Sequence, residues 1–373
     1  MKYLVKLLLP FLLLSLVLAS CAPAEEATPA DEAAPAEEAA PTEEAEESPA
    51  EEMEEVTLVD WGYSGEIQTG VFGEYMAKPF MEENPNVNIE LLGGISEDAI
   101  AQIKAAQGAS PIDTMLLGEP RYLQAEREGW ILPITGDDIP NVSEVYENIQ
   151  AHCEPAAVAW SVELIGLVYN PDLVPKPESW ADLWNPEYEG MVGMAAPSSN
   201  AGFLFLMMVG NQFGSGEDDL DTIWSRLDEL QPFVVANNPE TLSQLLENEE
   251  IGVAINWNTE AAVSLGKGFN VEFTLPEPGG IAQVGCYGVL KDTAHPEIAK
   301  EYVNTALGLD FQQSMSEPPW FFAPVNKNVV LSEESAKILP SPEQYPNLIT
   351  IDFEKALPLR EDLTDEFIQK YGQ

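Results

Sequence analysis

The sequence predicts an α/β protein with a mainly parallel sheet, and three observations lead to this prediction. Short apolar strands alternate with helical segments of about ten or more residues, which is typical of βαβ units because parallel strands need a long crossover connection. The length of 373 residues suggests about two domains. Hydrophobic residues make up 45% of the chain and aromatic residues 9%, so a sizeable buried core is expected.

The first half of the pattern opens with a buried strand at 56–59 and a loop that leads into a helix. Ligands bind outside the carboxyl ends of the strands in such sheets. We therefore expect a binding site near Trp61 to Ser64 and near Gly118 to Pro120. The predicted strands are 56–59, 87–92 and 114–117. One predicted helix ends near residue 83, and two others span 97–107 and 121–128.

A long strand-like segment at 156–169 separates this set from a second α/β set. No period of 20–50 residues is visible, so the pattern does not favour a repeat array. The second set has predicted strands at 191–195, 233–236, 252–255 and 282–290, helical segments at 180–184, 219–230 and 240–247, and a helix from about 200.

The charge of the chain excludes one class of partner. Acidic residues number 64 against 16 Lys and Arg, which gives a formal net charge of -48. Because a polyanion is repelled by such a field, we expect no nucleic-acid partner. The ordinary hydrophobic content shows that the charge excess does not make the whole chain disordered.

Residues 1–20 resemble a bacterial lipoprotein signal peptide. Two lysines precede an apolar run at 7–18, which is too short for a comfortable membrane span, and Leu-Ala-Ser precedes Cys21. The resemblance implies cleavage before Cys21 and lipid attachment to it, so that the protein is anchored on the outer face of the cytoplasmic membrane, periplasmic or extracellular. The alternative is an ordinary signal peptide with an incidental cysteine.

Residues 21–55 form the next predicted segment, in which the lipidated Cys21 is followed by an acidic Ala/Glu/Pro tether. The segment contains 14 acidic residues and neither Lys nor Arg. Since it cannot bury a core, we expect an extended tether that holds the folded part away from the anionic membrane. An acidic interaction tail is the alternative.

One string in the second half resembles a known family. Residues 179–190 read SWADLWNPEYEG, and "EREGWILPI", "IGVAINWNTEAA", "PEPGG" and "APVNKN" agree in order. This pattern is similar to the solute-binding proteins of ABC importers, in the branch of the spermidine/putrescine binders and their relatives for iron, thiamine and phosphonates. The likeness spans residues 56 to about 335.

The resemblance implies a two-lobed periplasmic-binding-protein-like fold of type II, with a mainly parallel sheet and flanking helices in each lobe. A small-molecule solute is held in the cleft between the lobes, and closure of the cleft signals to a membrane permease, the permease of an ABC importer. It also implies discontinuous lobes, with 56–161 plus 258–307 as lobe 1 and 162–257 plus 308–373 as lobe 2.

The candidate site has two sets of residues that favour different solutes. Trp61, Tyr63 and Trp257 match the aromatic residues of the polyamine binders, and aromatic faces attract ammonium groups. Ser64, in the same loop as Tyr63, is a further candidate. The carboxylates match less well, and Glu119 and Glu260 are the acidic candidates. Each of these aromatic and acidic side chains has an alternative role in the core or on the surface.

Where polyamine binders have acids, this chain has Ser198, Ser199 and Asn200 before a helix. Such residues cap helices, and the free N–H groups of a helix start bind anions. We rank a polyamine-type solute first and a small anion, such as a phosphonate or carboxylate, second. Ferric iron ranks below both because no adjacent Tyr-Tyr pair is present.

An extracytoplasmic hydrolase is the alternative from another class. The histidines are His152 and His295, and in an extended strand His152 and Cys153 point to opposite faces, which does not suit a catalytic pair. No metal-ligand spacing or phosphate loop is present, so we expect no cofactor, no metal and no enzyme activity. Cys153 and Cys286 either form a disulfide or remain buried thiols.

Overall fold

A computed structural model describes residues 54–372 except 64, 66, 95, 107–109, 135 and 232. The predicted signal peptide, Cys21 and the tether lie outside the described residues. The described residues all belong to one compact unit. Among the described residues, no helix is both long and apolar enough to cross a membrane.

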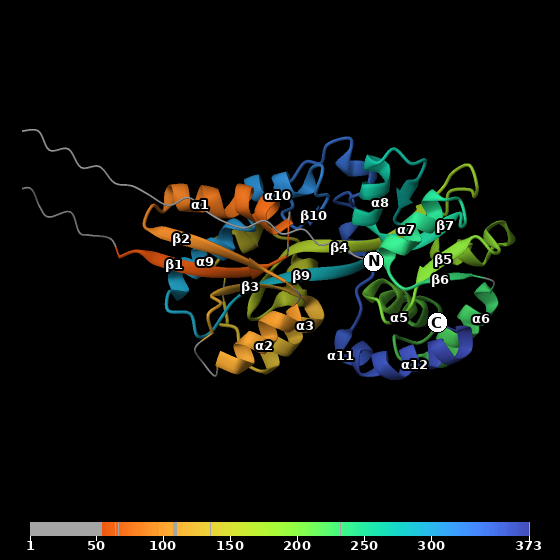
Figure 1. Cartoon of the computed structure of the whole chain (residues 1–373), viewed down its shortest axis with the longest axis horizontal. Helices are drawn as coiled ribbons and strands as arrows, with labels where there is room; N and C mark the ends of the chain where they lie inside the picture. Colours follow the sequence, from red (N-terminus) through yellow and green to blue (C-terminus); the bar gives the residue numbers. More distant parts are fainter. Residues whose placement is uncertain are drawn as a thin grey trace, which may run out of the picture. The chain divides into compact units, whose positions relative to one another are not determined.

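One large mixed sheet runs through this unit, with helices packed around it (Figure 1). The strand order is β2-β1-β3-β9-β4-β7-β5-β6, and β8 and β10 both pair with β4. The strands are β1 (Val56–Gly62), β2 (Val87–Gly93), β3 (Thr114–Gly118), β4 (Ala157–Tyr169), β5 (Val192–Ala195), β6 (Val234–Ala236), β7 (Val253–Trp257), β8 (Glu272–Thr274), β9 (Ile281–Val289) and β10 (Ala323–Pro324).

The predicted parallel pairing is found at both ends of the sheet. Strands β2, β1 and β3 run parallel, and so do β7, β5 and β6. In the centre, β9 pairs antiparallel with β3 and β4, and β4 pairs antiparallel with β7. These two long central strands have almost continuous apolar sequences, so the sequence pattern identifies them as buried strands without giving their direction.

The helices begin and end close to the predicted positions. Pro at the first turn, as in α7, fixes a helical φ where no N–H partner is needed, and Asn238 accepts a hydrogen bond from Thr241 N to cap that helix. The helices are α1 (Lys78–Glu83), α2 (Ser96–Ala106), α3 (Glu119–Arg127), α4 (Glu147–Gln150), α5 (Asn200–Phe213), α6 (Leu220–Leu230), α7 (Pro239–Glu247), α8 (Asn258–Gly266), α9 (Pro296–Thr305), α10 (Leu309–Ser316), α11 (Phe353–Ala356) and α12 (Arg360–Tyr371).

Several shorter segments have tighter or wider helical turns. The predicted helix after β1 begins as a π-helical segment, η1, and the predicted helix at 180–184 is a 3-10 helix, η4. These segments are η1 (Ile67–Ala77), η2 (Pro140–Glu144), η3 (Ala151–Cys153), η4 (Trp180–Trp184), η5 (Pro186–Tyr188), η6 (Ser335–Lys337), η7 (Tyr345–Asn347) and η8 (Leu357–Leu359).

Two hydrophobic cores lie along the sheet. Strand β4 contributes to both, because its residues up to Leu164 pack in the first core and those from Ile165 pack in the second. Buried residues from Phe311 to Tyr345, which the sequence analysis assigns to lobe 2, pack in the first core, whereas those from Ile349 to Phe367 pack in the second. The lobe boundaries themselves stay a prediction.

Candidate functional site

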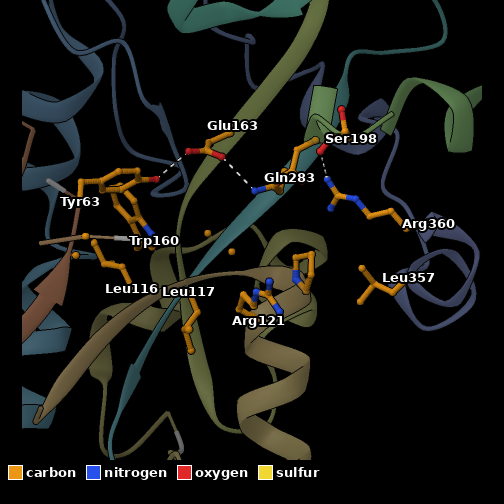
Figure 2. Close-up of a pocket in the computed structure, with 16 residues that line it drawn as sticks. Tyr63, Leu116, Leu117, Arg121, Trp160, Glu163, Ser198, Gln283, Leu357 and Arg360 are labelled. Carbon is orange, nitrogen blue, oxygen red and sulfur yellow. Dashed lines mark hydrogen bonds between the residues drawn. The ribbon is translucent and has the colours of Figure 1, made fainter. Parts of the chain in front are cut away.

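The candidate site is a cavity of about 690 Å³ at the carboxyl ends of the parallel strands. Residues at or just beyond the ends of β1, β2, β3 and β5 line it, which agrees with the expected position of a ligand in such a sheet. The central strands β4 and β9, the N-terminal residues of α3, α5 and α12, and the start of η8 supply the remaining walls (Figure 2). The cavity is therefore lined by residues associated with both cores.

A carboxyl group forms one side of the cavity. Glu163, in β4, accepts a hydrogen bond from the Tyr63 hydroxyl at 2.8 Å and another from Gln283 Nε2 at 3.2 Å. Burial raises the pKa of Glu163, and the Tyr63 hydrogen bond lowers it by a smaller amount. The carboxyl group is thus held in a fixed position, and a cation beside it would favour its ionised form.

Aromatic rings stand next to this carboxyl group. The rings of Tyr63 and Trp160 lie edge to face with centroids 6.0 Å apart, and Phe72 and Phe322 contact both. A Cβ on Gly285 would lie 2.6 Å from Trp160 Nε1, so a side chain at this position would displace the indole. Glycine at 285 therefore helps to fix the aromatic wall.

Two arginines form another part of the wall. Arg121 lies in the first turn of α3, and Arg360 is the first residue of α12. Arg360 Nη2 donates a hydrogen bond to the Ser198 carbonyl at 2.9 Å, and its guanidinium lies 5.0 Å from the Phe203 ring centroid. Planar guanidinium groups suit carboxylate and phosphate geometry, so this part of the cavity favours an acidic group.

Three of the predicted site residues line the cavity, namely Tyr63, Ser198 and Asn200. Ser198 and Asn200 are exposed, and Asn200 begins α5. Ser199 is the residue before the helix, but its side chain makes no capping hydrogen bond, and it does not line the cavity. Ser64 lies outside the described residues.

The other aromatic candidates do not line the cavity. Trp61 is buried in the first core, and its Nε1 has no hydrogen-bond partner within the described part of the chain. Trp257 is half-buried at the end of β7 and packs against the second core. Trp61 thus occupies a core position, which is the alternative role given above, whereas Trp257 is only partly buried beside the second core.

The two acidic candidates have partners elsewhere. The Glu119 carboxylate lies 2.8 Å from His152 Nδ1 and is buried, and this hydrogen bond raises the pKa of His152. Burial raises the pKa of Glu119. Glu260 accepts a hydrogen bond from the Ser243 hydroxyl at 2.9 Å. Neither carboxyl group lines the cavity.

The expectation of an extended strand at His152 and Cys153 is wrong. Both residues lie in the 3-10 helix η3, because the chain turns there before it enters β4. Cys153 forms a disulfide with Cys286 of β9, with their Cα atoms 5.5 Å apart. The pairing that the sequence left open is thus present, and neither sulfur is a thiol nucleophile in this state.

Sequence reasoning missed Arg121, Trp160, Glu163, Gln283 and Arg360. A signal existed for Arg121, since it follows a predicted strand end in a chain with 16 basic residues. Glu163 was also detectable as a carboxyl group within an otherwise apolar strand. No local signal indicated that Arg360, 239 positions beyond Arg121, would line the same cavity, because only the tertiary fold brings α12 there.

This architecture, with two cores joined by long strands and a cavity lined from both, is that of a solute-binding protein. The profile of the bacterial extracellular solute-binding protein family matches residues 75–342. The chain therefore belongs to this family, which confirms the class that the sequence pattern indicated.

Individual relatives agree with this assignment. The spermidine/putrescine-binding periplasmic protein of Escherichia coli K12 is 25% identical over 218 residues, which are 57% of this chain and 61% of that protein. The corresponding protein of Salmonella typhimurium is 26% identical over 196 residues, 52% of this chain and 55% of that protein. The chain thus spans less than two thirds of the length of the curated relatives it matches.

Solved structures share the fold. An extracellular solute-binding protein from Bordetella parapertussis has a TM-score of 0.77 at 21% identity and covers 84% of this chain and 98% of its own. The spermidine/putrescine ABC transporter substrate-binding protein of Streptococcus pneumoniae has a TM-score of 0.66 at 18% identity and covers 84% and 98%. At these identities the likeness concerns the fold, and it supports the two-lobed architecture.

Proposed function

We propose that this protein captures a small anionic solute and delivers it to an ABC importer. The observation that carries the proposal is the convergence of Arg121 and Arg360 on one cavity, beside the exposed Ser198 and Asn200 at the start of α5. Two guanidinium groups and a helix N-terminus favour a carboxylate, phosphonate or phosphate group. The cavity of about 690 Å³ is large enough for a small solute.

Calorimetry of glutarate and ethylphosphonate tests this proposal on the wild type, Arg360→Gln and Arg226→Gln. We expect Arg360→Gln to weaken the bound anion about 10-fold or more, because a hydrogen bond to a charged group is lost. Arg226 is the matched control, since it stacks on Trp184 and Phe213 and does not line the cavity. Equal affinities for all three proteins would contradict the proposal.

A polyamine is the second candidate, and the curated relatives favour it. Glu163 and the rings of Tyr63 and Trp160 suit an ammonium group, whereas the two arginines repel a polycation. Calorimetry of putrescine and spermidine on the wild type, Glu163→Gln and the control Glu260→Gln, whose carboxylate does not line the cavity, distinguishes the candidates. Tight polyamine binding that Glu163→Gln abolishes and Glu260→Gln retains would support this candidate.

We also propose that the protein is anchored to the membrane through a lipid on Cys21. The lipoprotein-like signal and the acidic segment at 21–55 support this part of the proposal. Cells grown with a labelled fatty acid should incorporate the label into the wild type but not into Cys21→Ser. Labelling that survives the substitution would contradict anchoring through this residue.

We propose solute capture without chemical turnover. The disulfide between Cys153 and Cys286 supports this view, because neither sulfur can act as a thiolate nucleophile in this state. A bound solute should be recovered unchanged after long incubation with the protein. Steady turnover of an ester or amide would instead support the hydrolase alternative.

A further inference from the structure

The cavity carries groups of opposite charge on different sides. Glu163, Tyr63 and Trp160 gather on one side of the view in Figure 2, and Arg121 and Arg360 lie away from them. The Glu163 side chain extends from β4, whereas the arginines extend from α3 and α12. A single extended solute would therefore meet an acceptor at one end and donors at the other.

On the Glu163 side, the cavity can accept a hydrogen bond from the solute. The two carboxylate oxygens of Glu163 accept one protein hydrogen bond each, from Tyr63 and Gln283, and a carboxylate offers about four lone-pair sites in all. The two protein donors fix the position of the group, so a further donor can bind it without a large loss of side-chain entropy. A simple anion leaves this acceptor capacity unused and places a like charge near the carboxylate.

The aromatic rings favour a cationic donor at this position. Tyr63 and Trp160 both line the cavity next to Glu163, and aromatic faces attract ammonium groups. An ammonium group there would contact a carboxylate and aromatic carbon together. An amine at this position would agree with the names of the spermidine/putrescine-binding relatives.

We propose that the solute is a small amino acid-like molecule, with an ammonium group at Glu163 and an acidic group at Arg121 and Arg360. The proposal rests on the proposed function and narrows its solute class. Aminoalkylphosphonates and amino dicarboxylates carry both an ammonium group and an acidic group that suits a guanidinium.

Calorimetry with matched pairs of solutes tests the proposal. The pairs are 2-aminoethylphosphonate with ethylphosphonate and glutamate with glutarate, in which one member lacks the amine. For the wild type we expect the amine to improve affinity about 10- to 100-fold, as for a hydrogen bond between charged groups. Glu163→Gln should weaken the amino compounds by that factor and leave the amine-free anions unchanged or slightly tighter.

Glu247→Gln is the matched control. Its carboxylate also accepts two hydrogen bonds, from Ser264 Oγ and Lys267 Nζ, but it does not line the cavity, so the amine preference should persist. Circular dichroism and thermal melting of the Glu163→Gln protein show whether it is folded, and tight binding of the amine-free anions serves as a second check.

The outcomes separate this inference from the proposed function. If amine-free anions bind as tightly as amino compounds and Arg360→Gln weakens both, the anion proposal stands and the amine subsite is overturned. If Glu163→Gln weakens both members of a pair equally, the inference is likewise overturned. If polyamines bind and no acidic probe binds at millimolar concentration, both proposals are overturned.

Discussion

The indole nitrogen of Trp180 donates a hydrogen bond of 2.9 Å to the backbone carbonyl of Gly279, which joins two segments 99 residues apart. Trp180 is buried in the second core, and the same pair of segments is tied by backbone hydrogen bonds between Glu178, Trp180 and Glu277. A Cβ on Gly279 would lie 2.0 Å from the Asn347 carbonyl oxygen, so the turn before β9 requires glycine. This contact fixes where β9 enters the sheet.

We predict that Trp180→Phe destabilises the protein by about 1–3 kcal/mol, because the half-buried Gly279 carbonyl loses its donor and the smaller ring leaves unfilled space at a buried position. Urea denaturation measures the change. Trp184→Phe is the control, since its indole donates to the Arg226 carbonyl at 2.8 Å from a half-buried position where water can replace the bond. The loss should be smaller for Trp184→Phe, and equal losses would contradict the argument.

In the string at 179–190, which carries the family resemblance, at least three residues stabilise the fold. Ser179 and Asp182 form a capping box at the start of η4, and Trp180 packs in the core. Local hydrogen bonding and apolar burial leave a clear pattern in the sequence, so the strands, helices and this motif could be predicted. The cavity arginines leave no such pattern, because their meeting depends on how α3 and α12 pack.

The two predicted tryptophans illustrate the same limit. Trp61 follows the end of the predicted strand 56–59, as a site residue would, yet it lies within β1 and its ring is buried in the first core, where a Cβ on Gly94 would lie 2.8 Å from it. Tyr63, two residues later, lines the cavity. Sequence spacing predicts the neighbourhood of a site, but side-chain direction after the last strand residue depends on the loop.

We predict that loss of the Cys153–Cys286 disulfide destabilises the protein by about 2–5 kcal/mol. The bond closes a loop across 133 residues and so restricts the unfolded chain. Urea denaturation with and without dithiothreitol measures the effect. The control is the double variant Cys153→Ala and Cys286→Ala, whose midpoint should not respond to reductant. Two free thiols in the unreduced, unfolded Cys21→Ser protein would show that the bond is absent.

A pH-dependent prediction follows from Asp60, which is fully buried in β1. Tyr287 and Thr114 both donate to its Oδ1, at 2.6 and 2.7 Å, while Oδ2 has no hydrogen-bond partner among the described residues. Burial raises the pKa of Asp60 to about 6, whereas its ordinary value is 3.8. The folded state therefore binds this proton more tightly than the unfolded state does.

Because of this difference, rising pH should lower the free energy of unfolding between about pH 4 and 6. The contribution of Asp60 is fully present below pH 3.8 and is lost above pH 6, by about 3 kcal/mol in total. Asp60→Asn removes the titrating group. The free energy of unfolding of this variant, relative to that of the wild type, should therefore rise as the pH increases from about 4 to 6. Urea denaturation from pH 4 to 7 measures the difference, and the exposed Asp137→Asn should follow the wild type. Parallel curves for Asp60→Asn and the wild type would show that the argument is wrong.

The last prediction concerns closure of the cavity around its solute. The side chains that would hold a bridging solute belong to different cores, since Arg121 lies on α3, against β3, and Arg360 lies on α12 beside Phe203 of the second core. Strands β4 and β9 join the two cores. In β4, Leu164 packs in the first core and Ile165 in the second, and in β9, Ile281 packs in the second core and Ala282 in the first. A solute that contacts both arginines should draw the two cores together.

We therefore expect small-angle X-ray scattering to show a smaller radius of gyration when a tight solute saturates the protein. The same solute should raise the free energy of unfolding by about 2.7 kcal/mol at a hundredfold excess over Kd, because it binds only the folded state. Arg360→Gln should reduce both effects at equal solute concentration, whereas Arg226→Gln should retain them. Stabilisation without any compaction would mean that the solute binds a cavity that is already closed, and the closure mechanism would then be abandoned.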